Sequence, residues 1–221
     1  MNAEITGCFR SSRSYSELWA DDHPSYDFVN ETCAGYRTGD VLNLVEDKDF
    51  PTDAALVSMT IGGNDEGFGD VMDTCDGDSA KKCLHAIDAA EAQAKATLPA
   101  ALKAVLTLIR YKEPHAKIVV MGYPEMFDTS RLDNCPSRPL RDTLQPLNKA
   151  VGLLDELIEK ATVDARDKYA DVRDIFKDHV ICDYDKVRWM NYYYSDLDIP
   201  FHPNADGQKY GYLPVFTKAA K

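Results

Sequence analysis

The feature that constrains the fold most is a long amphipathic segment between two short apolar runs. The runs are residues 55–61 (ALVSMTI) and 117–121 (KIVVM), and a glycine follows each one. Short apolar runs that end at glycine are typical of buried strands. Between them, residues 80–111 place apolar side chains at steps of three and four, which predicts a long helix with one apolar face and Pro99 as the place for a kink. The order strand, helix, strand favours a parallel sheet.

The rest of the chain continues this alternation. The patterning predicts, in chain order, a helix at 11–20, a strand at 26–29, a long helix at 140–168, a strand at 171–176 and a closing helix at 205–218. No repeat or linker-like stretch interrupts the 221 residues, so we expect one domain spanning 1–221. The fold class is α/β, with a three-layer, doubly wound parallel sheet. Such sheets bind ligands in the loops beyond the carboxyl ends of their strands.

The cysteines indicate the redox compartment in which the protein folds. There are six, widely spaced and without a CxxC pair, so they favour disulfides over a zinc or thioredoxin-type site. The alternative is six buried free thiols in a cytosolic protein. The first ten residues lack a signal-peptide pattern, so the disulfide interpretation carries the expectation that the natural protein starts further upstream. The cysteines are Cys8, Cys33, Cys75, Cys83, Cys135 and Cys182.

The net charge of the chain limits the classes of binding partner that we expect. The net charge is −12 with acidic residues throughout, which argues against nucleic acid and against an anionic membrane surface. No run of 18 apolar residues is present, so no membrane span is expected. The five histidines are scattered and form no HExxH motif, so neither a metal nor another cofactor is expected.

Three segments carry candidate chemistry. The first apolar run leads into Gly62-Gly63-Asn64, where a side-chain amide at a strand end can donate to a developing oxyanion. His202 precedes Pro203 at the start of the closing helix, and histidine is the usual base for activating a serine hydroxyl. Gly35 lies in a turn before a helix, where free backbone N–H groups can point at an anion. Each segment taken alone is also compatible with an ordinary turn or a structural histidine.

Together the three segments resemble a known family. The order CAG-x-x-T-x-DV, TIGGND-x-GF and FHPNADG-x-x-x-GY is similar to the SGNH (GDSL-type) hydrolases, above all the secreted actinomycete and fungal lipases and esterases. The segments CFRS and GYPEMF resemble the same branch. The resemblance implies a flavodoxin-like fold, secretion to the extracellular space and carboxylic-ester hydrolysis on a small-molecule, lipid or sugar ester.

The resemblance also implies residue roles. The Gly35 N–H and the Asn64 amide would form the oxyanion hole, and His202 would act as general base. Many family members carry an aspartate three residues before this histidine, whereas this chain has Ile199 there. The resemblance to the secreted esterases implies that the Ile199 backbone carbonyl orients His202, with Asp198 as a weaker candidate. It further implies the disulfides Cys8–Cys33, Cys75–Cys83 and Cys135–Cys182.

One part of the family pattern is missing. The family's nucleophilic serine follows a first strand that ends in GDS, upstream of the position of Cys8. This chain has no serine there, and its own Gly77-Asp78-Ser79 triplet follows no buried strand. We therefore expect a chain that lacks the first, interior strand and its nucleophile, through truncation, and that is inactive as printed. A sheet without that strand should have a defect near its centre.

Two other functions remain open. The first is a non-catalytic carbohydrate- or lipid-binding protein on the same scaffold, for which the aromatic run from Trp189 to Tyr194 could be a stacking surface or simply core. The second is a hydrolase that uses Ser79 of this chain as its nucleophile.

Overall fold

The computed structural model describes residues 7–135, 139–183, 187–192 and 200–221. Its centre is a parallel sheet in the order β1-β2-β3, formed by β1 (Leu56–Met59), β2 (Lys117–Met121) and β3 (Lys168–Ala170). In register, Leu56 lies opposite Lys117, and Val119 lies opposite Lys168. The α/β class and the parallel sheet predicted from the sequence are therefore confirmed.

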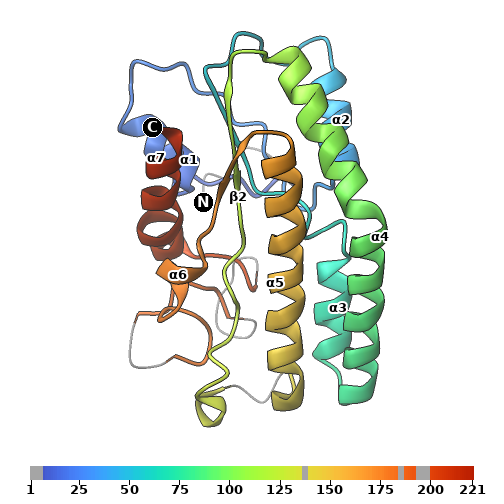
Figure 1. The fold of residues 1–221 in the computed structure, drawn as a ribbon. Coiled ribbons are helices and arrows are strands. Elements are labelled where there is room, and N and C mark those ends of the chain that lie inside the picture. The colour runs from blue at the N-terminus through green and yellow to red at the C-terminus, as the bar shows by residue number, and fades with distance from the viewer. Residues whose placement is uncertain (1–6, 136–138, 184–186, 193–199) are drawn as a thin grey trace.

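Helices lie on both sides of β2 (Figure 1). One side carries α2 (Thr38–Glu46), α3 (Phe68–Cys75), α4 (Ala80–Lys112) and α5 (Arg141–Asp164). The other side carries α1 (Tyr15–Asp21), α6 (Arg173–Phe176) and α7 (Leu213–Ala220), with a π-helical segment at Gly207–Tyr212 leading into α7. A short 3-10 turn, Leu132–Asn134, precedes α5. Within the described ranges, no helix combines the length and the apolar character that crossing a membrane requires.

The alternation of side chains along β2 explains the two cores. Ile118 and Val120 pack with α4 and α5 residues such as Leu98, Leu102 and Ile158. Val119 and Met121 point to the opposite face, where the core includes Phe176, Tyr212 and Phe216. Because both faces of a strand in a doubly wound sheet are covered, β2 reads as a continuous apolar run.

Two predicted strands are wrong. Residues 171–176 hold no strand: β3 ends at Ala170, and Asp171 accepts a hydrogen bond from the Arg173 backbone N–H at 2.9 Å, which turns the chain into α6. Residues 26–29 begin with a bend at Tyr26 and belong to no strand of the described sheet. Their apolar side chains are exposed, with Val29 at 54%. An extended segment becomes a strand only when a neighbour pairs with its backbone.

The β1 strand is an edge of the described sheet. It pairs with β2 on one side, and no other strand in the described residues pairs with its outer side. All four of its residues are only half-buried, although Leu56, Val57 and Met59 are apolar. By contrast, four of the five β2 residues are buried. A half-exposed apolar strand that ends at the Gly62 turn is unusual, because natural edges are normally blunted by charge or covered.

Candidate active site

The turn after β1 is shaped by Gly62. Its φ is +117°, a conformation that side chains rarely adopt, and a Cβ there would lie 3.3 Å from Leu154 and 3.5 Å from Ile158. Only glycine lets the backbone pass this close to α5 and still turn. The turn then directs Asn64 away from the helices and toward the Cys33–Arg37 loop.

Asn64 faces the loop that contains Gly35. Its Nδ2 donates to the Tyr36 carbonyl at 3.0 Å. A primary amide has two N–H bonds, so a second one is left for a ligand. Gly35 has φ +84°, and its N–H donates to no other described residue. The structure therefore brings together the two donors that the sequence singled out, the backbone N–H of Gly35 and the side-chain amide of Asn64.

His202 donates a hydrogen bond through Nδ1. Its Nδ1 lies 2.8 Å from the Pro200 carbonyl, which can only accept, so Nδ1 carries a proton. In the neutral imidazole this arrangement leaves the lone pair on Nε2. The imidazole is exposed. The loop that carries it is fixed by the Asn191 N–H, which donates to the His202 carbonyl at 2.8 Å.

Phe68 joins the Asn64 turn to the histidine. Its ring meets the His202 ring edge to face, with centroids 6.5 Å apart, and its N–H donates to the Gly63 carbonyl at 3.2 Å. The turn that presents Asn64 thus lies between the Gly35 loop and His202. Sequence analysis gave Phe68 no role. It lies inside the TIGGND-x-GF segment, but that position alone says nothing about a contact more than a hundred residues away.

Tyr123 contacts the same turn through its hydroxyl. Its hydroxyl accepts a hydrogen bond from the Gly63 N–H at 3.3 Å, and its own N–H donates to Asp155 at 2.8 Å. Burial raises the pKa of Tyr123 well above its usual value, so it stays neutral. Burial also raises the pKa of Asp155 to about 7, although the Tyr123 N–H and Arg173 favour its charged form. Arg173 Nε lies 3.6 Å from the Asp155 carboxylate.

The arrangement of these residues agrees with the protein family and the solved structures to which the chain is similar. Residues 2–210 match the GDSL-like Lipase/Acylhydrolase family. The chain belongs to that family. Its fold matches an extracellular lipase from Streptomyces rimosus with a TM-score of 0.89 at 34% identity, covering 97% of this chain and 89% of that one. It matches a phospholipase A1 from Streptomyces albidoflavus NA297 with a TM-score of 0.86 at 34% identity, with the same two shares covered. Lipase 1 of Streptomyces coelicolor is 36% identical over 96% of this chain and 78% of its own length.

The residue expected to orient the histidine in this family member lies outside the described residues. Neither Ile199 nor Asp198 belongs to the described ranges, so the part played by the Ile199 carbonyl stays a prediction. Among the described atoms, the Pro200 carbonyl is the one that holds Nδ1. Nor do the described residues contain a group of three or more His, Cys, Asp or Glu side chains that could hold a metal ion.

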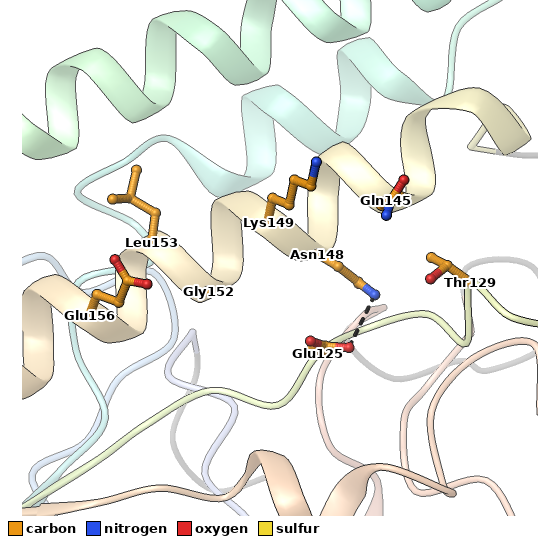
Figure 2. Close-up of a pocket in the computed structure, with 8 residues that line it drawn as sticks. All are labelled: Glu125, Thr129, Gln145, Asn148, Lys149, Gly152, Leu153 and Glu156. Atoms are coloured by element: carbon orange, nitrogen blue, oxygen red, sulfur yellow. Dashed lines mark hydrogen bonds between the residues drawn. The ribbon is translucent and has the colours of Figure 1, made fainter.

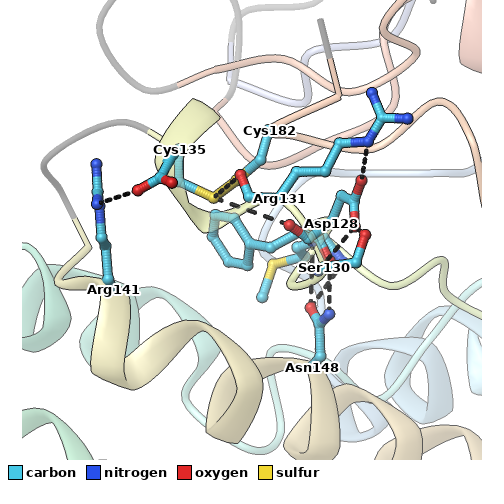
Figure 3. Close-up of a disulfide and its surroundings, with 10 residues drawn as sticks. Asp128, Ser130, Arg131, Cys135, Arg141, Asn148 and Cys182 are labelled. Atoms are coloured by element: carbon cyan, nitrogen blue, oxygen red, sulfur yellow. Dashed lines mark hydrogen bonds and ion pairs between the residues drawn. A yellow bond between two sulfur atoms is a disulfide. The ribbon is translucent and has the colours of Figure 1, made fainter. Parts of the chain in front are cut away.

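The three disulfides are the pairs that the family resemblance implies: Cys8–Cys33, Cys75–Cys83 and Cys135–Cys182. The first lies next to the Gly35 loop, and the second links α3 to α4. The third lies beside the segment that follows β2 (Figure 3), where the buried Asn148 accepts from the N–H groups of Met126 and Phe127. The staples therefore support the segments around the candidate site.

A polar groove lies along α5, on the other side of the segment that follows β2 (Figure 2). Its volume is about 370 Å³. Asn148 Nδ2 lies 3.4 Å from the Glu125 carboxylate at its floor. A Cβ on Gly152 would meet nothing within 4 Å, so no packing contact requires glycine there. The groove is lined by Glu125, Thr129, Gln145, Asn148, Lys149, Gly152, Leu153 and Glu156.

Proposed function

We propose that this chain is a carboxylic-ester hydrolase that uses serine–histidine chemistry, with His202 as the base and with Gly35 and Asn64 as the oxyanion donors. One observation carries the proposal. The Nδ1–H of His202 is bound to a carbonyl, which leaves Nε2 as a proton acceptor beside the turn that presents the Asn64 amide. A base with this tautomer and an adjacent pair of N–H donors suit acyl transfer.

The reaction follows from these positions. A serine hydroxyl attacks the ester carbonyl while His202 Nε2 takes its proton. The Gly35 N–H and the second Asn64 N–H stabilise the negative oxygen of the tetrahedral intermediate. His202 then gives the proton to the departing alcohol, and water releases the acyl group by the same steps in reverse. The Pro200 carbonyl keeps the imidazole oriented and stabilises its charged form.

The nucleophile, in this proposal, comes from a strand that pairs with the outer edge of β1. Two serines of the described chain already have partners. The Ser79 hydroxyl caps α4 by accepting from the Lys82 N–H at 3.4 Å, and Ser58 lies in β1 at 3.4 Å from the Tyr15 hydroxyl. The half-exposed apolar edge of β1, whose carboxyl end leads into the Asn64 turn, is where a further parallel strand would deliver a side chain to the site. In this proposal the described residues supply the base and the oxyanion donors, and the added strand supplies the nucleophile.

We also propose that the protein acts outside the cytosol as one domain spanning 1–221, on an ester of lipid or small-molecule type. Three disulfides favour an oxidising compartment. The similar proteins described above include an extracellular lipase and a phospholipase A1. Net charge of −12 favours a neutral ester over an anionic surface.

The proposal is tested by measuring ester hydrolysis after one strand has been added to the outer edge of β1. The chain is produced with an N-terminal extension that forms one parallel strand ending in Gly-Asp-Ser, and p-nitrophenyl butyrate is the substrate. We expect turnover that His202→Ala lowers by ~10³-fold or more and Asn64→Ala by ~10²-fold. His85→Ala, on a helix away from the site, is the matched control. Turnover that survives His202→Ala would contradict the assignment.

A non-catalytic carbohydrate-binding function is the second candidate, and the polar groove on α5 is the observation that favours it. The aromatic run offers less, because Trp189 stacks on His179 with centroids 3.7 Å apart and Met190 is buried. Tyr193 and Tyr194 lie outside the described residues. Titration of the printed chain with cellotetraose and xylotetraose by calorimetry separates the two functions. Binding that Gly152→Phe abolishes supports the carbohydrate function, and no heat with either sugar rejects it.

A further inference from the structure

Asp65 connects the two loops that carry the proposed oxyanion donors. Both of its carboxylate oxygens lie 3.1 Å from the Thr38 N–H, and one accepts from the Thr38 hydroxyl. Thr38 is the first residue of α2 and is only 4% exposed, so these bonds are shielded from water. Because 27 residues separate the partners, the contact is tertiary and not part of a local turn.

The other side of Asp65 is fixed as well. Its N–H donates to the Gly62 carbonyl at 3.1 Å, and its carbonyl accepts from the Gln93 side chain of α4 at 3.2 Å. The residue before it, Asn64, donates to Tyr36. Two adjacent residues of one loop thus bind two residues of the other, on either side of Arg37. Such a double link fixes both the distance and the relative orientation of the loops.

Capping of α2 alone does not account for Asp65. A carboxylate near a helix N-terminus is favourable because it meets unpaired N–H groups and the positive end of the helix dipole. Asp40 in the first turn serves the same helix end locally, accepting from the Arg37 N–H at 2.8 Å, while Asp65 accepts from the next N–H, that of Thr38. What Asp65 adds is the connection from α2 to the Asn64 turn.

We propose that Asp65 is a positioning residue that holds the Gly35 N–H and the Asn64 amide at a fixed separation. The inference rests on the proposed function for its meaning, because the two donors matter as a pair only if they share one oxyanion. The effect on the loops can be measured without turnover: when the Asp65 carboxylate is removed, the Asn64–Tyr36 hydrogen bond is the remaining one of the two links, and the relative orientation of the loops is less well fixed.

The test compares Asp65→Ala with Asp40→Ala in the printed chain. Both variants remove a carboxylate that caps α2, but only Asp65 reaches the other loop. Amide hydrogen exchange is measured by NMR over residues 35–41 and 62–68, together with the side-chain amide signals of Asn64. Losing a buried, charge-assisted hydrogen bond costs enough to speed local opening ~10-fold or more.

We expect Asp65→Ala to speed exchange ~10-fold in both segments and to speed exchange of the Asn64 side-chain proton bound to Tyr36. Asp40→Ala should affect residues 37–41 only. If both variants act on 37–41 alone and leave the Asn64 signals unchanged, Asp65 is a helix cap and the proposal is wrong. Should Asp65→Ala fail to fold, Asp65→Asn takes its place, since it removes the charge and one acceptor oxygen while keeping the shape, and the same pattern of exchange is expected with a smaller effect. Neither measurement uses ester turnover, so an inactive chain does not affect the result.

Discussion

At the scale of single residues, the histidine loop depends on an unusual backbone conformation. Phe201, directly before His202, has φ +58° and is 7% exposed. Its ring lies 6.2 Å from that of Phe127, and its N–H donates to the Asn191 carbonyl at 3.1 Å. A left-handed conformation costs a residue with a Cβ about 1–2 kcal/mol. The buried ring offsets this cost, and the strain lies directly beside His202, the proposed base.

Glycine should therefore be better tolerated than alanine at position 201. Both substitutions lose the buried ring, which costs about 3–5 kcal/mol, but only glycine relieves the strain. We expect Phe201→Gly to be more stable than Phe201→Ala by about 1 kcal/mol in urea unfolding. At Phe127, which is equally buried and has no left-handed φ, the order should be reversed. Alanine more stable than glycine at both positions would contradict the strain argument.

Glu66 predicts how stability depends on pH. Burial raises its pKa to about 8, with repulsion from Glu91, Asp65 and Asp155 adding to the effect, and its Oε1 is a buried atom without a hydrogen-bond partner among the described residues. The folded state therefore keeps a proton that the unfolded state releases above its ordinary carboxyl pKa. Stability from this group is fully present below about pH 4.5 and falls as the pH rises toward about 8.

Glu66→Gln removes that dependence. We expect it to match the parent near pH 4.5 and to be more stable by about 1–3 kcal/mol at pH 9. Chemical unfolding at the two pH values measures the difference. Glu156→Gln, at an exposed position on α5, is the control and should change little at either pH. If both variants changed the free energy of unfolding by the same amount at pH 9, ionisation of Glu66 would not be destabilising the folded state.

The sequence identified Gly35, Asn64 and His202 because each lies in a short motif with a chemical reason for its residue types. It gave no role to Phe68, Tyr123 or Asp65. Their roles arise from contacts with His202, Gly63 and Thr38, and such contacts between distant segments follow from the fold and not from local pattern. The partial burial of Glu66 could not be recognised because it lies in a turn with no helical or strand periodicity.

At the scale of elements, the long helices and the two apolar strands at 55–61 and 117–121 were predicted well, whereas the strands expected at 26–29 and 171–176 were not found there. Residues 80–111 and 140–168 became α4 and α5 because a long amphipathic period averages over many residues. The nearest strand to the one expected at 171–176 is β3, at Lys168–Ala170, because a three-residue strand with an exposed lysine gives too little signal and Asp171 turns the chain. The predicted start at 11 and the observed start at Tyr15 differ because Ser14 caps α1, accepting from the Glu17 N–H at 3.4 Å.

Helix α4 continues through Pro99, which is exposed. Proline inside a helix removes one backbone hydrogen bond and crowds the preceding turn. Pro99→Ala should therefore stabilise the protein by about 1–2 kcal/mol, or a rise of about 2–6 °C in Tm. Pro214 lies at the start of α7, where proline is tolerated, so Pro214→Ala should give no gain. A loss of stability in Pro99→Ala would mean that a bend at Pro99 is needed for packing against α5.

At the scale of the whole molecule, the open question is what lies beside β1. The β1 strand is apolar, its four residues are half-buried, and no other strand among the described residues pairs with its outer side. The fold still matches the lipase of Streptomyces rimosus with a TM-score of 0.89. Helices on both faces, two apolar cores and three disulfides support the remaining strands.

The central claim is that His202, Asn64 and Gly35 serve a serine delivered at the β1 edge. The most direct measurement is mass spectrometric mapping of a fluorophosphonate adduct, on the printed chain and on the chain extended by a Gly-Asp-Ser strand. We predict one adduct, on the added serine, which His202→Ala prevents, and no adduct on the printed chain. An adduct on Ser79, or on any other serine of the printed chain, would contradict the account.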